Sequence, residues 1–197
     1  MFEHLQEEVA VADPQSLRGT TPGSSNRRRL THVPFAIEPS VEPAAPVEYR
    51  WDADTEILAA SVADRRGGGS VSTSVELEGR DGSWVTLELR AGRLCGVEVA
   101  VWPPVKARSL LVPPTPATTG HVVYRPAVDL AGAADIEVDT PLSAESDRME
   151  RTFHMRVGTM RASRAVQVGR DILLEVDEAD QLAGVWLLNV PPIPHPS

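Results

Sequence analysis

Short runs in which apolar and polar residues alternate recur along the chain and predict β-strands. The runs at residues 47–51, 70–78 and 152–157 alternate with a period of two, as a strand does when one face is buried and the other is solvated. Weaker runs predict further short strands at residues 56–62, 109–112, 120–124, 135–139 and 162–168. The 17 prolines and 14 glycines among 197 residues favour many short elements joined by turns.

Helical patterns are few. Residues 2–11 place Phe2, Leu5 and Val9 at helical spacing, which predicts a short N-terminal helix. Residues 142–151 are the most helix-like part of the central region, with Ser143 as a possible N-cap.

The strand-rich stretch of residues 171–192 repeats an earlier stretch, residues 84–104. With one residue deleted at the turn, Leu87, Glu88, Leu94, Gly96, Val97, Pro103 and Pro104 correspond to Leu174, Glu175, Leu182, Gly184, Val185, Pro191 and Pro192. We therefore expect a mainly β protein, built from two repeated small antiparallel sheet modules packed together, with flexible Pro-rich arms at both ends.

The repeat and the composition predict five parts of the chain. An N-terminal arm or linker with a possible short helix takes residues 1–46, and a first β module takes residues 47–104. A connecting segment with short strands spans residues 105–148, the second β module spans residues 149–192, and a Pro-rich tail covers residues 193–197.

The first module carries a motif that resembles a known family. It opens with Tyr49-x-x-Asp52-x-Asp54 and closes with Gly92, Leu94, Gly96, Val97 and Glu98. This resembles the small bacterial family called domain of unknown function 2283, here in tandem. The second copy keeps Leu182, Gly184 and Val185 but has Trp186 where the glutamate would stand. The resemblance implies a small antiparallel sheet and no activity; an association of the family with toxin-like partners implies a toxin-neutralising role.

Charge and hydropathy restrict the partners. Nineteen basic and 28 acidic residues give a net charge of −9, which opposes the phosphate attraction that drives nucleic-acid binding. Residues 1–8 lack the basic and apolar regions of a secretory signal. No apolar run approaches the ~20 residues of a membrane helix. We therefore expect a cytoplasmic protein that binds neither nucleic acid nor membrane.

Candidate reactive groups are scattered. The five histidines show no metal-ligand spacing, and the sequence assigns no catalytic, cofactor-binding or metal-binding residue and no cofactor. His154 is expected on the polar surface of its strand, and Cys95 in the core. Glu88 and Glu175 occupy the same position in both copies. They are either outward residues of amphipathic strands or a carboxylate pair facing across the interface between the modules.

The second copy ends in a strand that is apolar on both faces. Trp186, Leu188 and Val190 share one side of it, and such a strand has to be covered twice. Trp186, Leu188 and Trp102 are therefore the candidate interface residues. We favour a non-catalytic protein-binding or assembly module that binds itself or a protein partner. The alternative is an enzyme, or a protein binding a small ligand or metal, with its site between the modules.

Overall fold

The structure, a computed structural model, describes residues 28–30, 32–63, 72–124 and 135–194. The described part is mainly β and contains no helix. Its strands are β1 (Arg28–Leu30), β2 (Phe35–Pro39), β3 (Val47–Asp52), β4 (Ile57–Val62), β5 (Ser72–Glu78), β6 (Trp84–Arg90), β7 (Arg93–Val101), β8 (Val105–Arg108), β9 (Thr118–Tyr124), β10 (Asp135–Asp139), β11 (Leu142–Asp147), β12 (Phe153–Val157), β13 (Ser163–Gly169), β14 (Ile172–Asp177) and β15 (Leu182–Leu187). The helix predicted at residues 2–11 lies outside the described residues.

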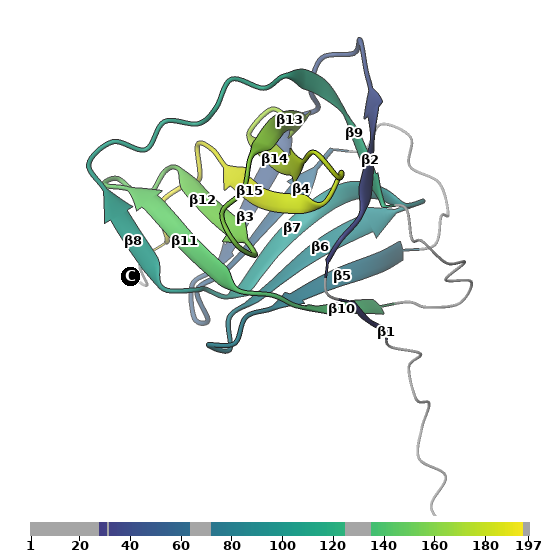
Figure 1. Ribbon diagram of the computed structural model, residues 1–197. Coiled ribbons are helices and arrows are strands. Elements are labelled where there is room, and N and C mark those ends of the chain that lie inside the picture. Colours follow the sequence, from purple (N-terminus) through teal and green to yellow (C-terminus); the bar gives the residue numbers. More distant parts are fainter. Residues whose placement is uncertain (1–27, 31, 64–71, 125–134, 195–197) are drawn as a thin grey trace, which may run out of the picture.

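The strands form one continuous sheet that curls until its two halves face each other (Figure 1). We call the half with the strand order β3-β4-β7-β6-β5-β10-β1 the first half-sheet. The second half-sheet has the order β8-β11-β12-β15-β14-β13. Strand β9 joins the halves, because it pairs with β7 on one side and with β13 on the other.

The core lies between the two half-sheets. Leu87 and Val97 face it from β6 and β7, and Leu174 and Val185 face it from β14 and β15; each is at most 1% exposed. Burying one such side chain contributes roughly 1.5–3 kcal/mol. Alternate residues of these strands therefore point to the opposite, outer faces of the curled sheet.

The hairpin between β6 and β7 is closed by a two-residue turn. Arg90 pairs with Arg93, and the two residues between them, Ala91 and Gly92, have φ values of 50° and 77°. Positive φ at both central positions matches the right-handed twist of the flanking strands.

Residues 142–151 do not form the predicted helix. Leu142–Asp147 is strand β11, which pairs with β12 on one side and with β8 on the other. The side chain of Ala144 enters the core. Two flanking strands satisfy the backbone of this segment, and this tertiary pairing outweighs the helix-start signal of Ser143 and Glu145.

Two other local expectations also differ from the structure. Residues 109–112 form no strand, and the strand of this region is the preceding β8. Within the predicted N-terminal linker, β2 pairs with β9, and both Val33 and Phe35 are buried in the core. In the part of the chain that the structure describes, no helix is long and apolar enough to cross a bilayer.

Candidate functional site

Three polar or aromatic side chains form a compact group on the outer face of the second half-sheet; we call it the His154 cluster. His154 Nε2 lies 3.2 Å from Glu175 Oε2, and Trp186 Nε1 donates a hydrogen bond of 2.9 Å to Glu175 Oε1. The rings of His154 and Trp186 are stacked, with centroids 4.2 Å apart and planes 8° apart. The group is assembled by strand register, since His154 on β12 pairs with Trp186 on β15.

Two members of the His154 cluster, His154 and Trp186, are buried although the cluster points away from the core. His154 is 7% exposed and Trp186 is 5% exposed, and the two rings stack on each other. The connection from β8 to β9, residues 109–117, passes on the side of the second half-sheet away from β5, β6 and β7 (Figure 1). The sequence-based placement of His154 on the surface is therefore wrong, because the pattern of one strand does not reveal that a tryptophan of another strand stacks on its histidine.

Glu175 is held as a carboxylate within this group. Burial alone would raise its pKa, but the hydrogen bonds from His154 and Trp186 outweigh it, and the pKa lies below its ordinary value. Both carboxylate oxygens have a donor within the cluster. The carboxylate therefore orients the imidazole and the indole, and this arrangement favours a packing role over a reactive one.

Gly184 makes room for the carboxylate. It pairs with Glu175 across β14 and β15, next to a register shift. A Cβ atom at Gly184 would lie 2.8 Å from Glu175 Oε2 and 3.0 Å from both His154 Nε2 and the carbonyl oxygen of Met155. A larger residue here would force the carboxylate, the imidazole or the backbone of β12 to shift.

The first half-sheet has the same glutamate–glycine pair without the rest of the cluster. Glu88 pairs with Gly96 across β6 and β7, again next to a register shift. The neighbouring paired positions hold Ala59 and Glu98, and Glu88 is exposed. Glu88 and Glu175 point outward from opposite half-sheets with the core between them. The structure thus does not bring them together as a carboxylate pair between the modules.

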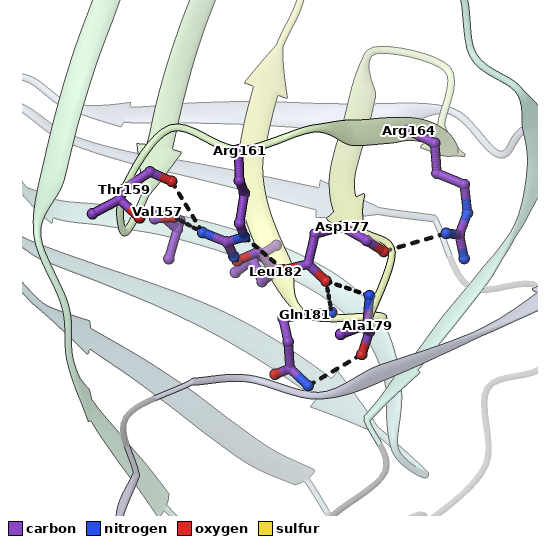
Figure 2. Close-up of polar contacts among 8 residues, drawn as sticks. All are labelled: Val157, Thr159, Arg161, Arg164, Asp177, Ala179, Gln181 and Leu182. Atoms are coloured by element: carbon purple, nitrogen blue, oxygen red, sulfur yellow. Dashed lines mark hydrogen bonds and ion pairs between the residues drawn. The ribbon is translucent and has the colours of Figure 1, made fainter.

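A second polar group surrounds Arg161 at the turn between β14 and β15 (Figure 2). Arg161 Nε donates to Asp177 Oδ2 at 2.6 Å, and its Nη1 donates to the carbonyl oxygens of Val157 and Thr159. Its Nη2 donates to the carbonyl oxygen of Leu182. The guanidinium of Arg161 therefore links the end of β12, the end of β14 and the start of β15.

Asp177 also closes its own turn. Its Oδ1 accepts hydrogen bonds of 2.9 Å from the backbone N–H groups of Ala179 and Gln181. Burial tends to raise the pKa of Asp177, but these N–H groups and Arg161 outweigh it and lower the pKa. A polar cavity of about 430 Å³ lies beside this group and is lined by Asp139, Thr140, Arg161, Asp177 and Gln181 among others. Because Arg161 and Asp177 are engaged with each other and with backbone, we assign them a structural role.

The candidate interface residues occupy different environments. Trp186 belongs to the buried His154 cluster, whereas Trp102 stacks on Trp51 and packs against Phe153 at the core. Leu188 is half-buried, and its carbonyl oxygen accepts a hydrogen bond from the Tyr49 hydroxyl. The structure does not gather Trp186 and Trp102 on one exposed face, and an interface role for the three residues stays a prediction.

Cys95 is not a core residue. It lies on β7 between Leu94 and Gly96 but is only partly buried, and it points into a cavity at the molecular surface. Within the described ranges, no group of three or more His, Cys, Asp or Glu side chains is arranged to hold a metal ion.

The feature that the sequence analysis missed is strand β8. Among the described strands it pairs only with β11, as the outermost strand of the second half-sheet, and all four of its residues are exposed. Its alternation of Val105, Lys106, Ala107 and Arg108 is the signal that could have identified it. The pattern is short and lies between Pro103-Pro104 and the apolar residues 110–112. The strand was predicted for the segment that contains those apolar residues, and not for β8.

Comparisons with known proteins add no assignment, since no protein-family model matches the chain and no curated protein matches it significantly.

Proposed function

We propose that this protein is a non-catalytic β scaffold that binds another protein by accepting a strand at the edge of β8. The observation that carries the proposal is the exposure of Val105–Arg108, which is paired on one side only among the residues that the structure describes. An edge strand has a row of backbone N–H and C=O groups that an incoming strand can satisfy. Binding of this kind needs neither a reactive residue nor a cofactor.

The two faces of β8 define the chemistry of the partner. Val105 is in register with Ala144, which faces the core, and Lys106 is in register with Glu145 on the outer face. Since side chains alternate along a strand, Arg108 lies on the same face as Lys106 and bonds Glu145. A strand added beside β8 would place apolar residues next to Val105 and acidic residues next to Lys106. The partner we propose is therefore a segment in which acidic and apolar residues alternate.

Exposed apolar side chains flank β8 along the chain. Val101 is 50% exposed before it, and Leu110 and Val112 are 79% and 66% exposed after it. A run of such residues beside an open edge is typical of a protein interface. These residues would add apolar contact to the backbone hydrogen bonds of the added strand.

We further propose that the scaffold arose by duplication of one β unit, as a tandem relative of the domain of unknown function 2283 family. The strand order β3-β4-β7-β6-β5 and the order β11-β12-β15-β14-β13 have the same connectivity. The pairs Glu88–Gly96 and Glu175–Gly184 occupy corresponding places in both. In this account the duplication supplies the fold, and β8, which lies outside both units, supplies the binding edge.

A labelled peptide tests the strand-addition proposal. A short fluorescein-labelled peptide with alternating valine and glutamate should bind with a saturable rise in anisotropy, whereas one with alternating valine and lysine should not. Lys106→Glu should weaken binding by roughly tenfold, because it replaces favourable exposed ion pairs with repulsion. The matched control is Arg50→Glu, an exposed residue of the other edge region on β3.

The location of binding has an independent readout, because Lys106 is the only lysine of the chain. Mass spectrometry should show slower acetylation of Lys106 when the valine–glutamate peptide is bound. Equal loss of binding in both charge variants, or unchanged acetylation at saturating peptide, would contradict the proposal. A stable dimer in light scattering whose Lys106 is protected without peptide would replace it with self-association.

A further inference from the structure

A second cavity lies where the curled sheet divides, and we call it the fork cavity. Strand β7 pairs with β4 through residues 96–99 but with β9 only at Arg93. Leu94 and Cys95, between these two pairings, lie at the fork where β4 and β9 diverge. The cavity measures about 470 Å³, within the roughly 300–1,000 Å³ that small-molecule sites occupy.

The wall of the fork cavity is fixed by backbone hydrogen bonds. The segment of residues 40–46 forms one side of it. Ser40 N donates to the carbonyl oxygen of Thr119 at 2.9 Å, and Ala63 N and Arg170 N donate to the carbonyl oxygens of Pro46 and Ala45. The segment is thus hydrogen-bonded to β9 at its start, and at its end to the residues that follow β4 and β13. A ligand entering this cavity meets a wall that is already ordered, which lowers the entropy cost of binding.

The floor of the fork cavity is apolar. Leu94 and Val168 line it and belong to the hydrophobic core, where they are 8% and 9% exposed. Val62, at the end of β4, and Pro43 and Pro46 on the attached wall add further apolar surface. A hydrocarbon or aromatic group placed there would remove this surface from water.

The rim of the fork cavity is cationic, although the whole chain carries a net charge of −9. Arg90, Arg93 and Arg170 line it together with His121, and Glu42 is the one acidic residue among its described lining residues. Glu38 bonds Arg93 Nη2 at 2.8 Å and so orients a guanidinium that has five N–H donors in all. Arginine binds carboxylates through two parallel hydrogen bonds, which a neutral group cannot reproduce.

We propose that the fork cavity binds a small amphipathic carboxylate, with its acid group on Arg93 and Arg170 and its apolar body on Leu94 and Val168. The cationic rim favours a ligand with a negative charge, and the apolar floor favours a ligand with an apolar tail. This site is separate from the β8 edge, and its failure would leave the strand-addition proposal unaffected.

The single cysteine of the chain reports on this cavity, because Cys95 lines it and is partly exposed. The probe is decanoate, and the measurement is the rate at which Cys95 reacts with N-ethylmaleimide, an uncharged reagent. Decanoate should slow the reaction saturably. Decanol, which has the same tail without the charge, should need at least roughly tenfold more for the same protection.

Charge-neutral variants test the assignment of the rim. Arg93→Gln and Arg170→Gln should each raise the half-protecting decanoate concentration by roughly tenfold. Arg148→Gln, at an exposed position outside the cavity, and Lys106→Glu should leave it unchanged. Unfolding by decanoate would accelerate the reaction and is thus distinguishable from binding. An unchanged rate, equal protection by decanol, or equal weakening by Arg148→Gln would overturn the proposal.

Discussion

Replacing Glu175 by glutamine tests whether this partly buried carboxylate contributes more to stability than Glu88, its exposed counterpart on the other half-sheet. In the native protein the carboxylate accepts hydrogen bonds at 2.9 Å from Trp186 and at 3.2 Å from His154, and its side chain is 16% exposed. In Glu175→Gln the amide oxygen can keep the bond to Trp186. The amide nitrogen then faces His154 Nε2, where two donors meet unless the imidazole changes tautomer.

The expected cost follows from these contacts. A hydrogen bond to a charged group contributes roughly 1.5–3 kcal/mol, and an unsatisfied buried group costs about the same. One of the two bonds is lost, so we expect the free energy of unfolding to fall by about 1–3 kcal/mol. Glu88→Gln is the matched control, because Glu88 has the same place beside Gly96 but is exposed, and it should cost less than about 0.5 kcal/mol.

Urea denaturation followed by tryptophan fluorescence measures both variants. The pKa of Glu175 is lowered in the folded protein, so its contribution is fully present above the unfolded value near 4.5 and is lost as pH falls through the lowered value. The stability gap between wild type and Glu175→Gln should therefore close in acid. A gap that persists unchanged below that range, or an equal cost for Glu88→Gln, would refute the reasoning.

Three further substitutions test other contacts of the fold, and urea denaturation measures the stability of each variant. Gly184→Ala should destabilise by about 1–3 kcal/mol, because its Cβ would lie 3.0 Å from a backbone oxygen. Gly96→Ala should cost less, because the nearest backbone oxygen is 3.3 Å away and the closer atom, Glu88 Oε2 at 2.6 Å, ends an exposed side chain that can move aside. Arg161→Met should cost roughly 1–3 kcal/mol, because Asp177 Oδ2 and the strand-end carbonyl oxygens lose the guanidinium as their donor. Its control is Arg148→Met, which changes an exposed residue and should be nearly neutral. Tyr49→Phe should cost about 1 kcal/mol, since the Tyr49 hydroxyl lies 2.9 Å from two carbonyl oxygens. Burial raises the pKa of Tyr49, so the alkaline spectroscopic titrations of wild type and Tyr49→Phe should differ by one tyrosine that ionises well above the ordinary pH range.

Alternation along the sequence predicts a strand correctly where the segment's own pattern of apolar and polar residues determines which face is buried. Residues 47–51, 70–78 and 152–157 alternate clearly and correspond to β3, β5 and β12. Residues 142–151 misled because Ser143 and Glu145 imitate a helix start, whereas two distant strands determine the outcome. β2 is missed because its five residues stand among prolines and gain their pairing from β9, far along the chain.

The outer faces were the least predictable part of the site. His154 alternates with core residues, so the sequence places it outward, and that direction holds. The strand of Trp186 is apolar on both faces, so its pattern does not show which way the indole points. The burial of both side chains depends on the stacking of the two rings across β12 and β15, and no local pattern encodes it. The same limit applies to Cys95, because only the divergence of β4 and β9 opens a cavity beside it. The sequence already shows Trp186 in place of Glu98 between the two copies, but only the strand pairing shows that Ala59 occupies the place of His154 in the first half-sheet.

The exposed edge of β8 is the basis of the functional account, and amide hydrogen exchange tests it most directly. Exchange at Val105–Arg108 should slow when the valine–glutamate peptide is bound, because an added strand takes up amides of this edge. The exchange rates of β3 amides should not change. Binding measured by anisotropy with unchanged exchange at β8, or with protection at another strand, would contradict the account.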